Sequence, residues 1–234
     1  MEDQRLRILI KTALIFIISY YVINWIGIAL ILGVFAKQIK SALLSAVLLS
    51  ILNISILVFF SFSYYKKYFS INIFQRPLEI DKFKAGLVKN LTMGFLISSI
   101  ATALAVFIRK IIDPTFQLTF NPKELLILDR LILQILHLGI FGPIAEEILF
   151  RGFFYRLSET LWNFKFSILA NVLLMMILHP RLEAFLGIAL ITIVLCNSYA
   201  KTRSLYKPIS IHISYNLTGM ILGYLIFPSE PANL

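Results

Sequence analysis

Long apolar stretches without any charge are the feature that most constrains this chain. Residues 12–36 and 42–65 contain no Asp, Glu, Lys or Arg, and residues 91–108 form a third such stretch. Transmembrane helices need about 17–25 mostly apolar residues to cross the hydrocarbon core of a bilayer, so each stretch is long enough to form a span. Because 59% of all residues are hydrophobic and only 15% are charged, the chain is predicted to be an integral membrane protein.

The second half of the chain continues the apolar pattern but carries polar residues within it. Further apolar stretches occupy residues 125–141, 166–178, 184–200 and 209–227. We therefore predict an all-α fold, a polytopic transmembrane bundle of about seven or eight helices with a polar cavity inside the membrane. No internal repeat or linker divides the 234 residues. The prediction is one membrane domain, with amino-terminal spans in residues 1–110 and a core in residues 124–227.

The charge of the chain predicts its orientation rather than a nucleic-acid surface. The formal net charge is +10, and in a membrane chain such a surplus is typical of cytoplasmic loops. The amino-terminal segment and the connector at residues 66–89 together carry more Lys and Arg than the loops of the opposite side. We therefore expect a cytoplasmic N-terminus, and the Ile-, Phe- and Lys-rich composition favours a bacterial cytoplasmic membrane. The orientation of the later helices stays open.

A pair of glutamates follows the fourth predicted span. Glu146 and Glu147 come shortly after Pro143, which favours the first turn of a helix, so both carboxylates are expected near a positive helix end. Glu147 and Arg151 are four residues apart, in the acid-before-base order that suits an ion pair on one helix face. Glu146 lies about 100° away around the helix and lacks that partner.

Two histidines and an asparagine lie further along the chain. His179 directly precedes Pro180, which predicts the end or a kink of a helix there. His212 and Asn216 are spaced to share one face of the last span. A lone residue of this kind usually packs inside a bundle, as we expect for His137 and Cys196. Polar side chains from three apolar helices, however, more often face a shared cavity than lipid.

These residue types can support peptide hydrolysis in two ways. Glu146 can take a proton from water and pass it to the leaving amine, with His179 positioning that water. His212 and Asn216 would then donate hydrogen bonds to the oxyanion. Alternatively, Glu146, His179 and His212 can supply the three N and O ligands of a catalytic zinc. The HExxH pattern is absent, and the spacing does not choose between a metal-free site and Zn²⁺.

The order Glu-Glu-x-x-x-Arg, an intramembrane His and then His-x-x-x-Asn resembles the CPBP family of intramembrane proteases. That family includes CAAX prenyl proteases and Abi-type bacteriocin-processing or immunity proteins. The resemblance implies that Glu146 is the catalytic base, that His179 acts with it on water, and that His212 and Asn216 form the third motif.

The same resemblance implies that Glu147 and Arg151 complete the first motif. The second motif usually begins with Phe, and this chain has Met175 at that position. Methionine can replace an aromatic side chain as apolar filler, so the departure bears more on substrate fit than on chemistry.

Two functions follow as hypotheses. The leading one is an intramembrane endopeptidase that hydrolyses a peptide bond in a membrane-associated peptide or protein, such as a peptide leader, a pheromone precursor or a prenylated substrate. The alternative is a non-catalytic scaffold or bacteriocin-immunity protein of the same fold, which binds and regulates a partner in the membrane or cell envelope. A transporter would predict paired repeats, which the sequence lacks.

Overall fold

The structure is a computed structural model that describes residues 80–116, 135–179 and 181–226, with a few positions near the N-terminus. Throughout these ranges the regular structure is helical, without a strand. The predicted spans at residues 12–36 and 42–65 lie almost wholly outside the described residues, as does the first part of the predicted helix at residues 125–141. The all-α prediction is therefore confirmed for the described part of the chain.

Four long helices match apolar stretches of the sequence. Helix α3 (Ile80–Ile112) is longer than the predicted span at both ends. Helices α7 (Phe164–Leu178), α8 (Phe185–Thr202) and α9 (Tyr206–Ile226) follow the later stretches closely. Two segments of the described residues, Gly86–Ile112 and Leu182–Thr202, are long and apolar enough to cross a membrane.

The glutamate pair lies within a continuous helical rod. The π-helical segment η3 (Ile135–Phe141) leads into α5 (Gly142–Glu147), followed by the π-helical η4 (Ile148–Tyr155) and by α6 (Arg156–Leu161). Pro143 lies in the first turn of α5, as predicted, but the flanking residues of α5 are themselves helical, so the prediction of a positive helix end at this point is wrong. Proline has no N–H to donate, and π-helical turns before and after α5 change the hydrogen-bond register around it. The carboxylates therefore lie inside a rod and not at a positive helix end.

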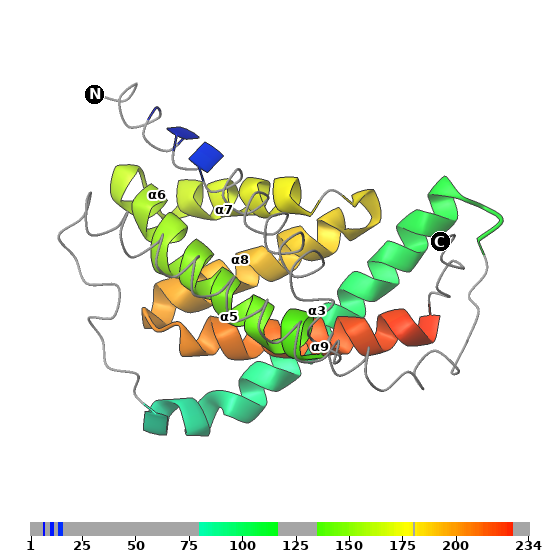
Figure 1. The fold of residues 1–234 in the computed structure, drawn as a ribbon, viewed down its shortest axis with the longest axis horizontal. Coiled ribbons are helices and arrows are strands. Elements are labelled where there is room, and N and C mark those ends of the chain that lie inside the picture. The colour runs from blue at the N-terminus through cyan, green and yellow to red at the C-terminus, as the bar shows by residue number, and fades with distance from the viewer. Residues whose placement is uncertain are drawn as a thin grey trace, which may run out of the picture.

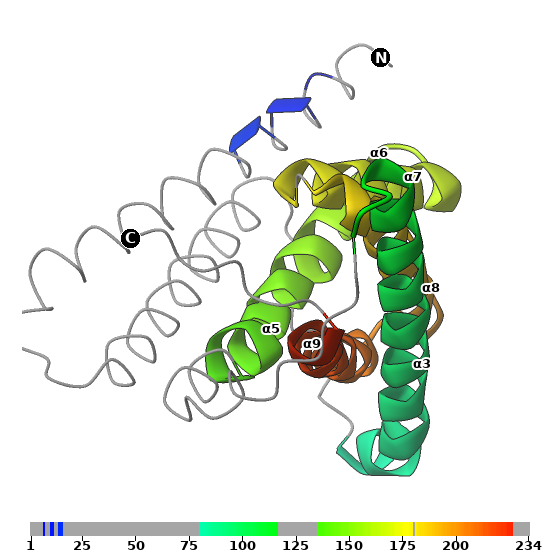
Figure 2. The same cartoon turned by 90° about the vertical axis from the view of Figure 1, so that its right-hand side faces the viewer.

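The rod and α9 pack against each other near the centre of the described structure. Figure 2 looks almost along α9, with α5 on one side of it and α3 on the other. Helix α8 packs against both α3 and α9, and α7 covers α8 and the rod (Figure 1). A short 3₁₀ turn, η5 (Leu182–Ala184), joins α7 to α8. The largest buried cluster connects the rod, α7 and α8 through Ala145, Leu149, Phe150, Phe153, Phe154, Leu157, Leu174, Met175, Leu178 and Ile188.

Helices α3 and α9 approach closely at a glycine. A Cβ atom placed on Gly94 would lie 2.7 Å from the Cβ of Ser214 and would also overlap the carbonyl oxygen of Ile211. The hydroxyl of Ser214 donates a 2.6 Å hydrogen bond to the carbonyl of Leu91, across the same contact. Small residues at crossings let helix backbones approach in membrane proteins, and here only a hydrogen fits.

We expect Gly94→Ala to destabilise the protein by about 1–3 kcal/mol, because the added methyl meets backbone that cannot move away. Gly86→Ala is the matched control on the same helix. Its Cβ would meet only the Asn90 amide nitrogen, at 3.8 Å, and alanine is favoured over glycine inside a helix. Thermal unfolding of the purified proteins in one detergent measures the difference. Equal melting temperatures for the two variants would contradict the close approach.

Candidate active site

A buried ion pair forms the centre of the candidate site. Arg151 donates from Nη1 to Oε1 of Glu147 at 2.9 Å, and both side chains are 0% exposed. This confirms the pair predicted from the four-residue spacing. The aromatic side chains of Phe150 and Phe153 are buried in the same stretch of the rod. Charges this deep are costly unless each is paired, so the two residues depend on each other.

His212 extends the pair from α9. Its Nδ1 lies 2.7 Å from the same Oε1 of Glu147. A carboxylate oxygen accepts hydrogen bonds, so Nδ1 carries the hydrogen and donates it. The second oxygen of Glu147, and Nε and Nη2 of Arg151, have no hydrogen-bond partner among the described residues. One carboxylate oxygen therefore holds the rod and α9 together.

Glu146 occupies a different environment from its neighbour. Its side chain is 15% exposed, and its Oε2 lies 3.7 Å from Nε2 of His212. That separation is too long for a hydrogen bond but short enough for electrostatic attraction to a protonated ring. Within the described part of the chain Glu146 makes no ion pair with Arg151. Glu147 is thus buried and paired, whereas Glu146 is partly open.

Asn216 lies one helical turn beyond His212. Its Nδ2 donates a 2.8 Å hydrogen bond to the carbonyl oxygen of Leu138 in η3. This bond uses one of the two amide hydrogens, so a second hydrogen and the Oδ1 acceptor remain. The prediction that His212 and Asn216 share a helix face agrees with the structure, since both point toward the rod formed by η3 and α5.

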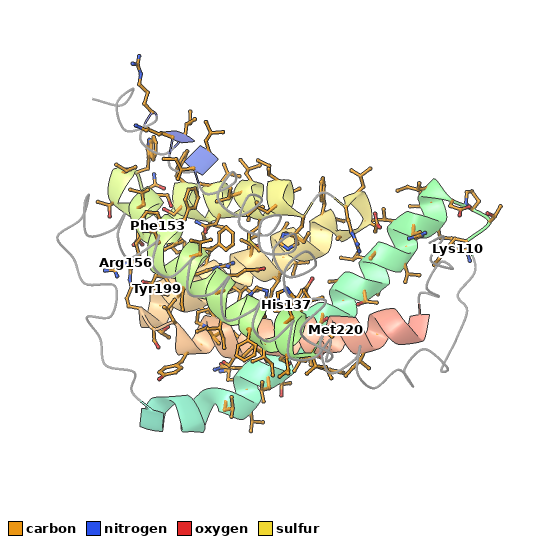
Figure 3. The ribbon with its side chains drawn as sticks, viewed as in Figure 1. Lys110, His137, Phe153, Arg156, Tyr199 and Met220 are labelled. Carbon is orange, nitrogen blue, oxygen red and sulfur yellow. The ribbon has the colours of Figure 1, made fainter. Side chains whose placement is uncertain are left out.

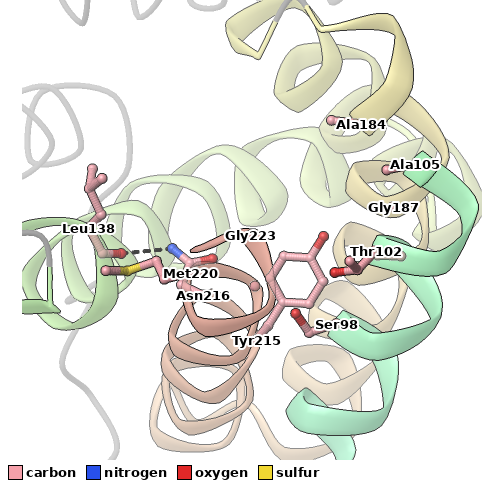
Figure 4. Close-up of a pocket in the computed structure, with 12 residues that line it drawn as sticks. Ser98, Thr102, Ala105, Leu138, Ala184, Gly187, Tyr215, Asn216, Met220 and Gly223 are labelled. Atoms are coloured by element: carbon pink, nitrogen blue, oxygen red, sulfur yellow. Dashed lines mark hydrogen bonds between the residues drawn. The ribbon is translucent and has the colours of Figure 1, made fainter. Parts of the chain in front are cut away.

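A cavity of about 320 Å³ begins beside these residues. It lies between α3, α8 and α9, and Asn216 and Tyr215 form part of its wall (Figure 4). The ring of Tyr215 also packs edge-on against the ring of His212, at 6.5 Å between centroids. The space follows α9 past Gly219 and Gly223; a Cβ on Gly223 would meet nothing within 4 Å.

The cavity wall is uncharged and mostly apolar. Its polar members are hydroxyl groups and one amide. Ser98 is 1% exposed, yet its hydroxyl has no hydrogen-bond partner among the described residues, and it borders the cavity with Thr102 and Tyr215. Of the motif residues only Asn216 lines this space. It therefore differs from the predicted polar cavity shared by the carboxylate and both imidazoles.

His179 stands apart from the contacts described above. It follows the last residue of α7, as Pro180 predicted, and its Nδ1 lies 3.0 Å from the carbonyl oxygen of Met175. A carbonyl only accepts, so Nδ1 carries hydrogen and Nε2 is the nitrogen left for other work. Among the described residues no hydrogen bond or ion pair joins His179 to Glu146 or His212.

The donor set does not fit a zinc ion. No three side chains of His, Cys, Asp or Glu come together as metal ligands within the described ranges. Glu146 and His212 approach each other, but His179 does not join them, and Nδ1 of His212 is engaged by Glu147. The structure brings together Glu146, Glu147, Arg151 and His212, with Asn216 one turn away.

One contact of the site was not predicted. Glu147 and His212 are separated by 65 positions, and no local pattern indicates that they bond directly. The sequence did predict an ion-pair partner for Glu147, but on its own helix. The sequence indicates only that His212 has some polar partner, because placing an imidazole in an apolar span without one costs free energy.

The part of the chain that carries these residues is similar to a known protein family. Residues 128–218 match the family model described as type II CAAX prenyl endopeptidase Rce1-like. The matched range contains the glutamate pair, Arg151, both histidines and Asn216.

The UPF0177 protein YbdI of Lactococcus lactis subsp. lactis (strain IL1403) is 26% identical over 88 residues, which are 37% of this chain and 47% of that protein. The alignment thus spans about half of its length. No solved structure matches the chain. The family match and the order of the motifs agree, and residues 128–218 are similar to the Rce1-like type II CAAX prenyl endopeptidases.

Proposed function

We propose that this protein is an intramembrane endopeptidase in which Glu146 is the catalytic base. The observation that carries the proposal is the approach of Glu146 to His212, at 3.7 Å, beside a buried Glu147–Arg151 pair. Two adjacent carboxylates in different surroundings can take different roles, one chemical and one structural. The match of residues 128–218 to the model of a protease family supports the same reaction class.

Glu146 is suited to activate water. It is the less buried of the two acids, and the described side chains do not neutralise it with a guanidinium. In this role its carboxylate takes a proton from water as the water attacks the scissile carbonyl. The same proton then passes to the leaving amine. His179, through Nε2, would hold the attacking water once substrate is bound, because catalytic contacts often tighten only in that complex.

His212 and Asn216 are suited to stabilise the oxyanion. Nδ1 of His212 already donates to Glu147, so donation to an oxyanion must come from Nε2. The ring lies between the carboxylates of Glu147 and Glu146. Asn216 would add its free amide hydrogen. Donors already aimed at the developing charge lower the barrier without reorganising during the reaction.

The cavity indicates where the substrate would extend. It starts at Tyr215 and Asn216, next to His212, and its lining carries no charge. An apolar part of a membrane-associated peptide would occupy this space, and the hydroxyl of Ser98 would hydrogen-bond a polar group within that part. The substrate class is thus a membrane-associated peptide or protein, and prenylated peptides are the first candidates because of the family description.

Glu146→Gln should abolish cleavage, because an amide cannot accept the proton from water. We expect uncleaved precursors to accumulate in membranes, as measured by quantitative proteomics of cells carrying the variant in place of the native chain. Glu183→Gln is the matched control, since Glu183 is a partly exposed carboxylate paired with Arg109 away from the site. His212→Ala should give the same precursors as Glu146→Gln. If both variants left every precursor at its native level, the protein would act as a scaffold instead.

Arg151→Met should destabilise the protein by about 3–5 kcal/mol, because it leaves the buried carboxylate of Glu147 without its cation. Adding Glu147→Gln to that variant should recover a large part of the loss, since the uncompensated charge is then gone. Thermal unfolding in detergent measures both effects. Glu146→Gln serves as the comparison and should melt within a few degrees of the native protein. Additive losses in the double variant would show that the pair is not coupled.

A further inference from the structure

One ion pair joins two turns at one end of the molecule. Arg203 donates from Nη2 to Oε1 of Glu159 at 2.9 Å, and Tyr155 donates to the same oxygen at 3.2 Å. Glu159 lies in α6, just before the turn into α7, and Arg203 lies just after α8 in a left-handed conformation, with φ of 53°. The α6–α7 turn and the α8–α9 turn are therefore adjacent.

A second ion pair marks the opposite end. Arg109 near the end of α3 lies 4.0 Å from Glu183, which precedes α8. Helix α8 thus runs from the Arg109 end to the Arg203 end. Figure 3 labels Lys110 and Arg156 at these two ends, far apart along the longest axis. The molecule has two distinct polar ends separated by apolar helices.

The two ends differ in charge. The turns that meet at Glu159 comprise residues 156–165 and 201–207, and we call them the basic end. They carry five cations and a single acid: Arg156, Lys165, Lys201, Arg203 and Lys207 against Glu159. The opposite end, residues 109–113 and 181–183, carries three cations and two acids: Arg109, Lys110 and Arg181 against Asp113 and Glu183.

Three lysines of the basic end have no acidic partner among the described residues. Glu159 is occupied by Arg203, and none of Lys165, Lys201 and Lys207 forms an ion pair or side-chain hydrogen bond within the described ranges. They come from the starts of α7 and α9 and from the end of α8, so they surround the joined turns. Lysines gathered beside apolar helices, without an unpaired acid next to them in the described ranges, are suited to phosphate groups at a membrane surface.

We propose that the basic end binds the headgroups of anionic phospholipids. The phosphates are contacted by Lys165, Lys201 and Lys207. The Arg203–Glu159 pair holds the α6–α7 turn against the α8–α9 turn. Trp162 lies in the α6–α7 turn between Glu159 and Lys165, where an amphipathic ring suits the headgroup region. Because anionic lipids and Lys- or Arg-rich loops both favour the cytoplasmic side, this end faces the cytoplasm.

Trp162 provides a direct readout of this binding. The chain has two tryptophans, so Trp25→Phe leaves Trp162 as the single fluorophore. The purified full chain in a neutral detergent is titrated with phosphatidylglycerol brominated on its acyl chains, which quenches a nearby indole. We expect saturable quenching with phosphatidylglycerol and much weaker quenching with phosphatidylcholine brominated in the same way.

The triple variant Lys165→Gln, Lys201→Gln, Lys207→Gln should raise the half-quenching concentration of phosphatidylglycerol on the order of a hundredfold. The matched control is the double variant Lys110→Gln, Arg181→Gln at the opposite end. This variant should change the half-quenching concentration less than twofold. Equal quenching by both lipids, or an equal loss in the control, would overturn the proposal. Neither outcome depends on proteolysis, so the result is independent of the proposed function.

Discussion

The carboxylate of Glu147 is the interaction on which the rest of the site depends. One of its oxygens accepts from Arg151 on the same rod and from His212 on α9. Without this oxygen, His212 of α9 would lose its hydrogen bond to α5, and with it the contact that orients its ring. Because the side chains of Glu147 and Arg151 are 0% exposed, the attraction between their charges acts at low dielectric and is strong.

In this arrangement the two neighbouring glutamates have different surroundings. Under the proposed function, one carboxylate anchors His212 while the other stays open to accept a proton. Glu147 takes the structural role because it is enclosed, and Glu146 keeps partial exposure on the adjacent face of the helix. The π-helical turns on both sides of α5 contribute to this placement, since such turns are frequent where a helix presents functional side chains.

Local features of the site could be read from the sequence. The four-residue spacing of Glu147 and Arg151 predicted their ion pair, and Pro180 predicted the end of α7 at His179. Apolar length predicted α3, α7, α8 and α9 to within a few residues, apart from the extended ends of α3. These predictions succeeded because each depends on neighbours along one helix.

The features that sequence reasoning missed depend on tertiary packing. Pro143 indicated a helix start, but the preceding residues continue the helix through a π-helical segment that no local pattern signals. The bond between Glu147 and His212 depends on how α9 crosses the rod. The cavity arises where Gly219 and Gly223 face α3, and its position beside Asn216 was not predicted either. Crossing angles are set by the whole bundle, so a single helix does not encode them.

The close contact of α3 with α9 bears on where the working unit of this protein begins. Helix α3 lies wholly before the range that matches the family model, yet it forms one wall of the cavity and accepts a hydrogen bond from Ser214 through the carbonyl of Leu91. The recognisable stretch of sequence is therefore smaller than the folding module. A fragment excised at residue 128 would lack α3 and would expose the glycine face of α9 to lipid, so residues 128–218 alone do not form the cavity.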